Sequence, residues 1–202
     1  MRKRKLEVGI IAWLTAGVFV MQSSITFAAC IEADQRDNMS NRPIVKETAN
    51  HLPLINITSP TAGGVSRNMY SLFNVPGNGA ILNNALSMTD TKLAGWINRN
   101  PFLQGGAAKV IVNEVTSANP SYINGFLEVA GNKASVVIAN PNGISVNGGG
   151  FINTADAILT TGRPEYGRGG NLQDFRVERG HVSVEGDGLN GCESDSVSIL
   201  PA

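Results

Sequence analysis

The sequence predicts an all-β protein, and three observations lead to that prediction. Short runs of apolar and β-branched residues alternate with clusters of Gly, Asn, Pro and Ser from residue 54 onward, which is strand and turn chemistry at short intervals. Helical periodicity is nearly absent, and at Met88–Trp96, the one segment with room for a helical turn, we expect a loop. The 202 residues include 23 glycines but few aromatic residues (2 Trp, 3 Tyr and 7 Phe), which suits a thin core of small aliphatic side chains.

The expected strands fit one domain of this length. In chain order they are Leu54–Thr58, Val65–Val75, Ala80–Asn83, Lys109–Thr116, Ser121–Val129, Ala134–Ala139, Ala157–Thr160, Asp174–Glu178 and His181–Glu185. The stretch Ala139–Thr154 is expected to alternate short strands with sharp corners. Two architectures fit this pattern: an antiparallel sandwich, or a parallel β-helix with stacked rungs of about 20–25 residues. Composition alone leaves both open.

The N-terminus has the pattern of a secretory signal peptide, which predicts export by the Sec machinery. A basic segment, Arg2–Lys5, precedes an apolar segment, Val8–Val20, and Thr26-Phe27-Ala28 provides a cleavage site. The apolar segment is too short for a comfortable membrane span.

This pattern divides the chain into three expected parts. They are a signal peptide at residues 1–28, an irregular leader at 29–53 and the main domain at 54–202. The leader is expected to be irregular because it is polar and contains Pro43 and Pro53.

Removal of the signal peptide changes the charge balance. The whole chain has 16 basic and 16 acidic residues, and residues 1–28 contain four of the basic ones and one of the acidic ones. The remainder has 12 basic and 15 acidic residues, a net charge near −3. This charge argues against nucleic acid or an anionic membrane surface as a partner.

The two cysteines, Cys30 and Cys192, lie near opposite ends of the mature chain, and we expect no disulfide between them. Cys30 also follows a sequence that loosely matches a lipoprotein cleavage box. Phe27 stands where such sequences usually have leucine, so we do not expect lipidation.

Residues that could carry chemistry are scattered along the chain. Gly186–Gly191 matches the dinucleotide-binding pattern G-x-G-x-x-G, but the residues after it are not helical, so we expect a turn. His51 and His181 each lack a second ligand at metal-binding spacing. The clustered acids of the C-terminal part are explained as solvated residues: Asp156, Glu165, Asp174 and Glu178. We therefore expect no metal, no cofactor and no enzymatic activity.

The segment Asn140-Pro141-Asn142-Gly143-Ile144 is the centre of the candidate functional region. A residue biased to extended conformation precedes a proline with fixed φ, and two residues that tolerate positive φ follow. Taken alone, such a segment is an ordinary surface turn.

With its neighbours this turn resembles the N-terminal secretion domain of two-partner-secretion exoproteins. These are the filamentous-haemagglutinin, haemolysin and contact-dependent-inhibition proteins of bacteria with an outer membrane. The similarity covers roughly Leu54 to Leu189 through an ordered series of short sequences: Gly64–Asn68, Phe73–Val75, Asn83–Leu86, Leu93–Ile97, Val110–Val115, Glu128–Gly131, Ile138–Ile144 and Gly148–Thr154. The resemblance implies a right-handed parallel β-helix with an N-terminal cap and a small extra-helical sheet. Aliphatic side chains should line the coil, for example Val110, Val112, Val137 and Ile144.

The chain departs from the family pattern in two places. The second family signature, NPNL, falls at Asn100-Pro101-Phe102-Leu103, where Phe102 replaces the second asparagine. One branch of the family has two cysteines just after NPNGI, and those positions are Val146 and Gly149 here. This chain therefore lies outside the cysteine-bearing branch.

The resemblance implies a secretion-targeting function. A cognate outer-membrane transporter would bind the domain through its POTRA domains, and the domain would fold as a β-helix outside the cell, either secreted or on the cell surface. The residues expected to serve transporter recognition or nucleation of folding are Asn100, Pro101, Leu103, Asn140, Pro141, Asn142, Gly143 and Ile144. Effector activity would belong to regions beyond residue 202. The alternatives are a stand-alone adhesin that binds glycan or host protein, and a polysaccharide-degrading β-helix enzyme.

Overall fold

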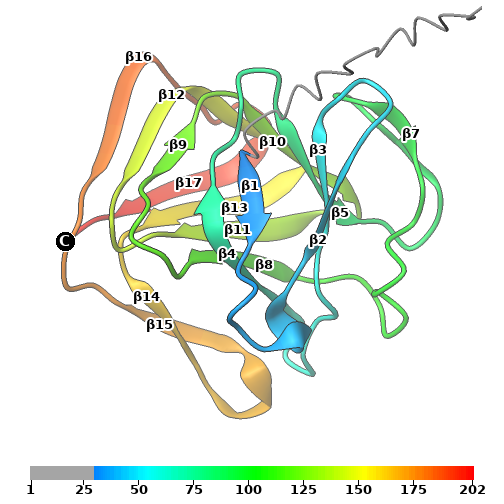
Figure 1. Ribbon diagram of the computed structural model, residues 1–202, viewed down its shortest axis with the longest axis horizontal. Helices are drawn as coiled ribbons and strands as arrows, with labels where there is room; N and C mark the ends of the chain where they lie inside the picture. The colour runs from blue at the N-terminus through cyan, green and yellow to red at the C-terminus, as the bar shows by residue number, and fades with distance from the viewer. Residues whose placement is uncertain (1–29) are drawn as a thin grey trace, which may run out of the picture.

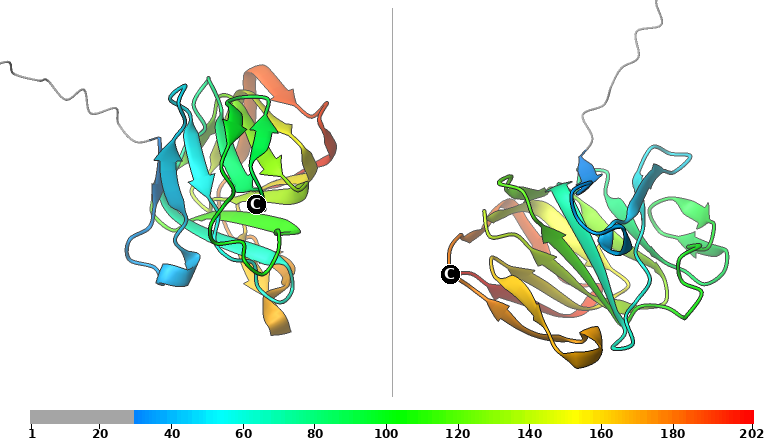
Figure 2. Two further views of the ribbon diagram at one scale, coloured as in Figure 1. Left: turned by 90° about the vertical axis from the view of Figure 1, so that its right-hand side faces the viewer. Right: turned by 60° about the horizontal axis from the view of Figure 1, so that its bottom comes forward.

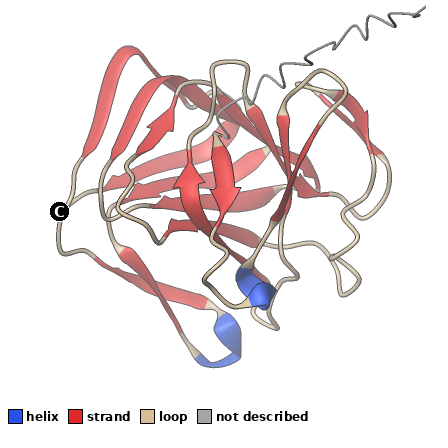
Figure 3. Ribbon diagram, in the orientation of Figure 1, coloured by secondary structure: helices blue, strands red, loops and turns tan. Residues whose placement is uncertain are grey.

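The computed structural model describes residues 30–202, so the expected signal peptide and cleavage site lie outside the described residues (Figure 1). In this part of the chain, regular structure consists of 17 strands and two helical turns, η1 (Met39–Asn41) and η2 (Arg168–Gly170) (Figure 3). Among residues 30–202, no helix has the length and apolar character needed to cross a bilayer.

Most strands belong to two sheets whose members come from successive turns of a coil. The six-stranded sheet has the order β1 (Ile31–Ala33), β4 (Val65–Phe73), β8 (Val110–Val115), β11 (Ala134–Ala139), β13 (Thr154–Thr160) and β17 (Ser194–Leu200). The seven-stranded sheet contains β2 (Ile44–Glu47), β3 (Pro53–Asn56), β5 (Ala80–Asn84), β10 (Phe126–Gly131), β12 (Ile144–Ile152), β16 (Val182–Asn190) and β9 (Ser121–Ile123). From β4 to β17 and from β3 to β16, every neighbouring pair is parallel.

The coil has a third face because the long strands bend. The start of β12 pairs with β9 and its end pairs with β10, so that Ile144 lies opposite Ser121 and Gly150 opposite Phe126. Between them the backbone turns at Gly148, whose φ of 75° is a conformation that glycine adopts without strain. One strand therefore contributes to two faces.

The spacing of register partners gives the length of a rung. Val110 pairs with Ser135, 25 residues further on, and Val136 pairs with Ala157, 21 residues further on. These lengths fit the expected rungs. The structure is a right-handed parallel β-helix, as the resemblance implied, and the sandwich alternative is wrong.

Two antiparallel hairpins lengthen the rungs that contain them. The first pairs β6 (Thr89–Thr91) with β7 (Gly95–Ile97), and the second pairs β14 (Arg163–Tyr166) with β15 (Leu172–Arg176). The second hairpin lies along the outside of the coil, as the right-hand view of Figure 2 shows. Met88–Trp96 was expected to be a loop and instead contains most of the first hairpin, because Thr and Trp suit strands and Gly95 provides a positive φ of 64°.

The predicted lining of the coil was right at one position and wrong at three. Ile144 belongs to the interior cluster, 2% exposed. Val110, Val112 and Val137 face outward, since side chains alternate along a strand and Ile111, Val136 and Ile138 take the inward positions. Hairpin β14–β15 covers these outward valines with the side chains Tyr166, Leu172 and Phe175. Both faces of these strands are apolar, so the sequence alone did not identify the inner face.

The expected irregular leader is also corrected. Within residues 29–53 the chain forms β1, η1 and β2 and then enters β3 at Pro53. Strand β1 pairs antiparallel with β4, and β2 pairs antiparallel with β3, so both strands cover edges of the first rung. Ile31 is 3% exposed and belongs to the interior cluster. The segment is therefore the N-terminal cap, and its polar composition reflects its position at the end of the coil.

A buried polar stack joins the first rungs to one another. The side-chain amide of Asn68 donates to the carbonyl of Val112 at 3.2 Å, and that of Asn113 donates to the carbonyl of Val137 at 3.2 Å. The hydroxyl of Tyr70 donates to the side-chain oxygen of Asn113 at 3.0 Å. All three polar side chains are fully buried, and these bonds satisfy groups that would otherwise be costly to bury.

Candidate functional site: two asparagine–proline corners

The first corner lies between β11 and β12, and the side chain of Asn140 organises it. Asn140 is fully buried, and its amide nitrogen donates to the carbonyl of Asn119 and to the hydroxyl of Ser121, both at 2.9 Å. Its side-chain oxygen accepts the backbone N–H of Asn142 at 2.9 Å. Its own N–H donates to the carbonyl of Thr160 in the next rung at 2.9 Å. Asn140 therefore connects three levels of the coil.

The rest of this corner directs the chain into the next strand. The N–H of Gly143 donates to the carbonyl of Asn140 at 3.1 Å, which closes a turn over Pro141 and Asn142. Gly143 has a φ of 106°, a conformation that residues with a Cβ rarely adopt. Ile144 then enters the interior of the coil.

The second corner has the same hydrogen-bond pattern. The amide nitrogen of Asn100 donates to the carbonyls of Ile57 and Asn83, both at 2.9 Å, and its side-chain oxygen accepts the N–H of Phe102 at 3.0 Å. Its own N–H donates to the carbonyl of Ala85 at 2.9 Å. Asn100 is 3% exposed. The two Asn-Pro sequences therefore form corners with the same side-chain hydrogen-bond pattern.

The replacement of the second asparagine by Phe102 leaves this corner intact. The turn uses the backbone N–H of that position, and any residue except proline supplies it. What changes is the side chain: at the first corner, Asn142 donates to the carbonyl of Ser117 at 2.7 Å and accepts from Arg179 at 3.3 Å. Leu103, the last residue of the motif, is 4% exposed in the interior cluster.

The fold places the two corners at opposite ends of the six-stranded sheet. The first follows the end of β11, and the second precedes the start of the parallel strand β8. Their hydrogen-bond partners do not overlap. The predicted site residues therefore form two separate corners, and no single site contains them all.

Sequence reasoning missed other asparagines that serve the same purpose. Asn84 is fully buried, donates to the carbonyls of Ala108 and Asn132 at 2.9 Å, and accepts the N–H of Ala108 at 2.8 Å. Asn153, at a φ of 54°, donates to the carbonyl of Val129 at 2.7 Å. The signal available in the sequence was an asparagine just after several of the strand-like runs, such as Asn84 after Ala80–Asn83 and Asn140 after Ala134–Ala139.

Two buried carboxylates that the sequence did not single out attach peripheral segments to the coil. Asp34 in the cap, 5% exposed, accepts from the side chain of Arg36 at 3.1 Å and from the hydroxyl of Thr116 at 2.5 Å. These hydrogen bonds, the Arg36 side chain first, hold the pKa of Asp34 well below its usual range. Glu128 in β10, 4% exposed, accepts the N–H groups of Lys92 and Leu93 at 2.8 and 2.9 Å. It thereby fixes the first hairpin.

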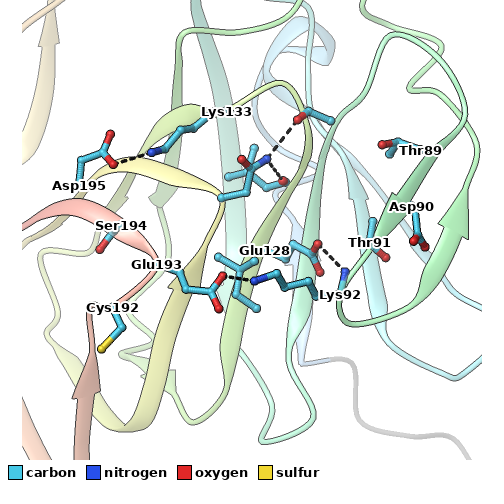
Figure 4. Close-up of a pocket in the computed structure, with 14 residues that line it drawn as sticks. Thr89, Asp90, Thr91, Lys92, Glu128, Lys133, Cys192, Glu193, Ser194 and Asp195 are labelled. Carbon is cyan, nitrogen blue, oxygen red and sulfur yellow. Dashed lines mark hydrogen bonds and ion pairs between the residues drawn. The ribbon is translucent and has the colours of Figure 1, made fainter.

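A polar cleft of about 590 Å³ lies between that hairpin and the last rung (Figure 4). Lys92 pairs with Glu193 and Lys133 pairs with Asp195, both at 2.5 Å, across the opening. Cys192, which is exposed, lies on the same rim. The lysines and the acids facing them neutralise one another, so the arrangement links the first hairpin and the β10–β11 turn to the last rung.

The other candidates for chemistry have structural explanations. Gly186 and Gly188 lie inside β16, a bent edge strand, and β17 follows as a strand, so this region is not a dinucleotide site. His51 contacts the carboxylate of Glu47 at 2.5 Å on an exposed turn. Among residues 30–202, no group of three or more His, Cys, Asp or Glu side chains is placed to hold a metal ion.

The fold and its corners define a class of protein, the β-helical secretion domain. The chain is similar to the filamentous hemagglutinin secretion domain, whose crystal structure matches with a TM-score of 0.76 and 36% identity over 85% of this chain and 55% of that one. The family model described as "TPS secretion domain" matches residues 29–201. The chain therefore belongs to the TPS secretion domain family. The match begins ahead of the cap, in agreement with the place of the cap in the fold.

The curated relatives include proteins far longer than this chain. The chain is 44% identical over 177 residues to "Toxin CdiA" of Yersinia pestis, covering 88% of this chain and 5% of that protein. It is 49% identical over 156 residues to "16S rRNA endonuclease CdiA" of Enterobacter cloacae, covering 76% of this chain and 5% of that protein. Against "tRNA nuclease CdiA-2" of Burkholderia pseudomallei, 42% identity extends over 98% of this chain and 7% of that protein. The chain thus spans only a small part of these relatives.

Proposed function

We propose that this chain is the secretion-targeting domain of a two-partner-secretion exoprotein, recognised by the POTRA domains of a cognate outer-membrane transporter. The observation that carries the proposal is the pair of Asn-Pro corners, built with one hydrogen-bond pattern inside a domain of the TPS secretion family. Export by Sec through the signal peptide at residues 1–28 would deliver it to the periplasm. Secretion or cell-surface display would follow.

Burial of several corner residues supports recognition of the chain before it folds. Asn140 is fully buried, Ile144 is 2% exposed and Leu103 is 4% exposed. A transporter that reads these side chains must therefore meet them before the domain folds. An extended segment can add as a strand to a POTRA sheet, with the backbone providing affinity and alternate side chains providing specificity.

Folding outside the cell would then favour outward movement. Each rung that stacks removes apolar surface from water at about 25 cal/mol per Å². The corner asparagines fix where each rung turns, so they would also guide nucleation of the first rungs. Recognition and nucleation are two consecutive uses of the same residues.

Binding of the POTRA domains to unfolded and folded protein tests the proposal. The purified POTRA domains of the cognate transporter are mixed with residues 30–202, either freshly diluted from urea or fully refolded. We expect binding to the freshly diluted chain that disappears at the rate at which β-structure forms. Absence of binding in both states, or equal and lasting binding to the refolded domain, contradicts the proposal.

A further inference from the structure

A small basic pocket lies beside the first Asn-Pro corner. It has a volume of about 170 Å³, which is room for one sugar ring. Three arginines line it together with a proline, a threonine and a single acid: Pro141, Thr161, Arg163, Arg176, Glu178 and Arg179. A cluster of guanidinium groups is unexpected on a mature chain whose net charge is near −3.

The arginines are placed so that their charges are only partly compensated. Arg163 and Arg176 are register partners on the antiparallel strands β14 and β15, where like charges directly opposite one another are destabilising. Glu165 pairs with Arg176 at 2.6 Å. Within residues 30–202, Arg163 and Arg179 form no ion pair, and the side chain of Arg179 donates a hydrogen bond to the amide oxygen of Asn142 at 3.3 Å. An anion in the pocket would relieve this repulsion.

The floor of the pocket is rigid. Gly180, with a φ of 91°, packs so closely on the corner that a Cβ there would lie 2.8 Å from the carbonyl oxygen of Pro141 and 3.1 Å from the side chain of Thr161. Thr161 is 1% exposed, and its hydroxyl oxygen accepts the N–H of Ala202 at 3.1 Å.

We propose that this pocket binds a carboxylated sugar, such as a hexuronate residue of an extracellular glycan. Guanidinium groups bind a carboxylate through two parallel hydrogen bonds. Glu178 would repel a simple acid but accepts hydrogen bonds from ring hydroxyls, and the ring of Pro141 offers an apolar wall to the C–H face of a sugar. The mixture of cations, one acid and one apolar wall therefore fits an acidic sugar better than an acidic peptide. This activity belongs to the folded domain and does not depend on the secretion proposal.

Calorimetric titration of folded residues 30–202 with tri-galacturonate tests the inference. We expect saturable binding, and we expect the fully methyl-esterified trisaccharide, which has the same size without the charge, to bind about tenfold or more weakly. Arg163→Gln and Arg179→Gln should each weaken binding by about the same factor. Arg168→Gln, on η2 and outside the pocket, is the matched control and should bind like the original protein.

Four outcomes overturn the inference. They are no binding of tri-galacturonate, equal binding of the esterified sugar, an equal loss in Arg168→Gln, and equally tight binding of tri-glutamate. The last would assign the pocket to an acidic protein partner. Thermal denaturation of each variant verifies that it is folded, so a loss of affinity cannot come from unfolding.

Discussion

At the scale of single residues, the corner asparagines hold the bends of this coil in place through side-chain hydrogen bonds. Each has one side-chain amide that donates two hydrogen bonds and accepts one backbone N–H at a bend where strand pairing stops. Removing such a side chain leaves several buried groups without partners, which costs about 2–4 kcal/mol of unfolding free energy. From the sequence we would expect about 1 kcal/mol for a turn residue, and the full burial of Asn140 raises that figure.

Asp34 makes the stability of the cap dependent on pH. Its pKa is lowered in the folded state, so its contribution is complete well above the unfolded value of 3.8 and is lost as the pH falls below it. We expect Asp34→Asn to lower the unfolding free energy by about 1–2 kcal/mol at pH 7 and by progressively less below pH 4. Urea denaturation at pH 7 and at pH 3 measures this difference. An equal loss at both pH values would show that the carboxylate charge is not involved.

At the scale of elements, the β14–β15 hairpin determines which face of the coil is covered. It packs on Val112 and Val137, and Arg67 lies over the ring of Tyr166 at 3.8 Å from the ring centre. Burial raises the pKa of Tyr166 to about 12, and within the described residues its hydroxyl has no hydrogen-bond partner. The contact is therefore driven by apolar and cation–π packing.

Substitution by phenylalanine should therefore change stability in opposite directions at the two tyrosines, Tyr166 and Tyr70. Tyr166→Phe removes a buried hydroxyl that makes no hydrogen bond, so stability should be unchanged or should rise by up to about 1 kcal/mol. Tyr70→Phe removes the bond to Asn113 and should cost about 1–2 kcal/mol. Chemical denaturation of both variants measures the contrast. A larger loss in Tyr166→Phe than in Tyr70→Phe would contradict this description of the hairpin contact.

At the scale of the whole molecule, the two ends of the coil differ. The N-terminal end is covered by the antiparallel strands β1 and β2, whereas β16 and β17 at the other end are the last strands of their sheets. Val184, Ile199 and Leu200 on these last strands are 40–46% exposed. An uncovered first edge would present unpaired backbone groups and apolar surface to solvent, so we expect the cap to belong to the folding unit.

Truncation of the cap tests this conclusion. A chain of residues 54–202 loses β1, β2 and the buried Ile31, and it exposes the edges of β3 and β4. We expect it to aggregate or to lose cooperative unfolding, whereas residues 30–202 should unfold in one transition. Sedimentation velocity and thermal circular dichroism compare the two. Equal solubility and an equal transition midpoint would show that residues 30–53 are dispensable.

Much of this architecture could be predicted, and the failures have physical causes. The alternation of short apolar runs with turn residues, together with the family resemblance, predicted the parallel coil, its corners and the length of its rungs. The inner face could not be read because β8 and β11 are apolar on both sides, one facing the interior and one facing the hairpin. The location of the expected N-terminal cap was missed, because strands at a solvated end have a polar composition and residues 29–53 looked irregular. The basic pocket was missed because its arginines come from two strands and a turn that only the fold brings together.

Secretion of two matched variants tests the central claim most directly. Asn140→Ala and Asn84→Ala each remove a fully buried corner asparagine with two donated bonds and an accepted backbone N–H, but only Asn140 belongs to an Asn-Pro sequence. The measurement is the amount of each variant secreted through the cognate transporter, set against its loss of unfolding free energy. If the Asn-Pro corner is read by the transporter, Asn140→Ala should be secreted about tenfold less than Asn84→Ala at a similar loss of stability of about 2–4 kcal/mol. Equal secretion of the two variants would contradict the account and leave the corner with a structural role alone.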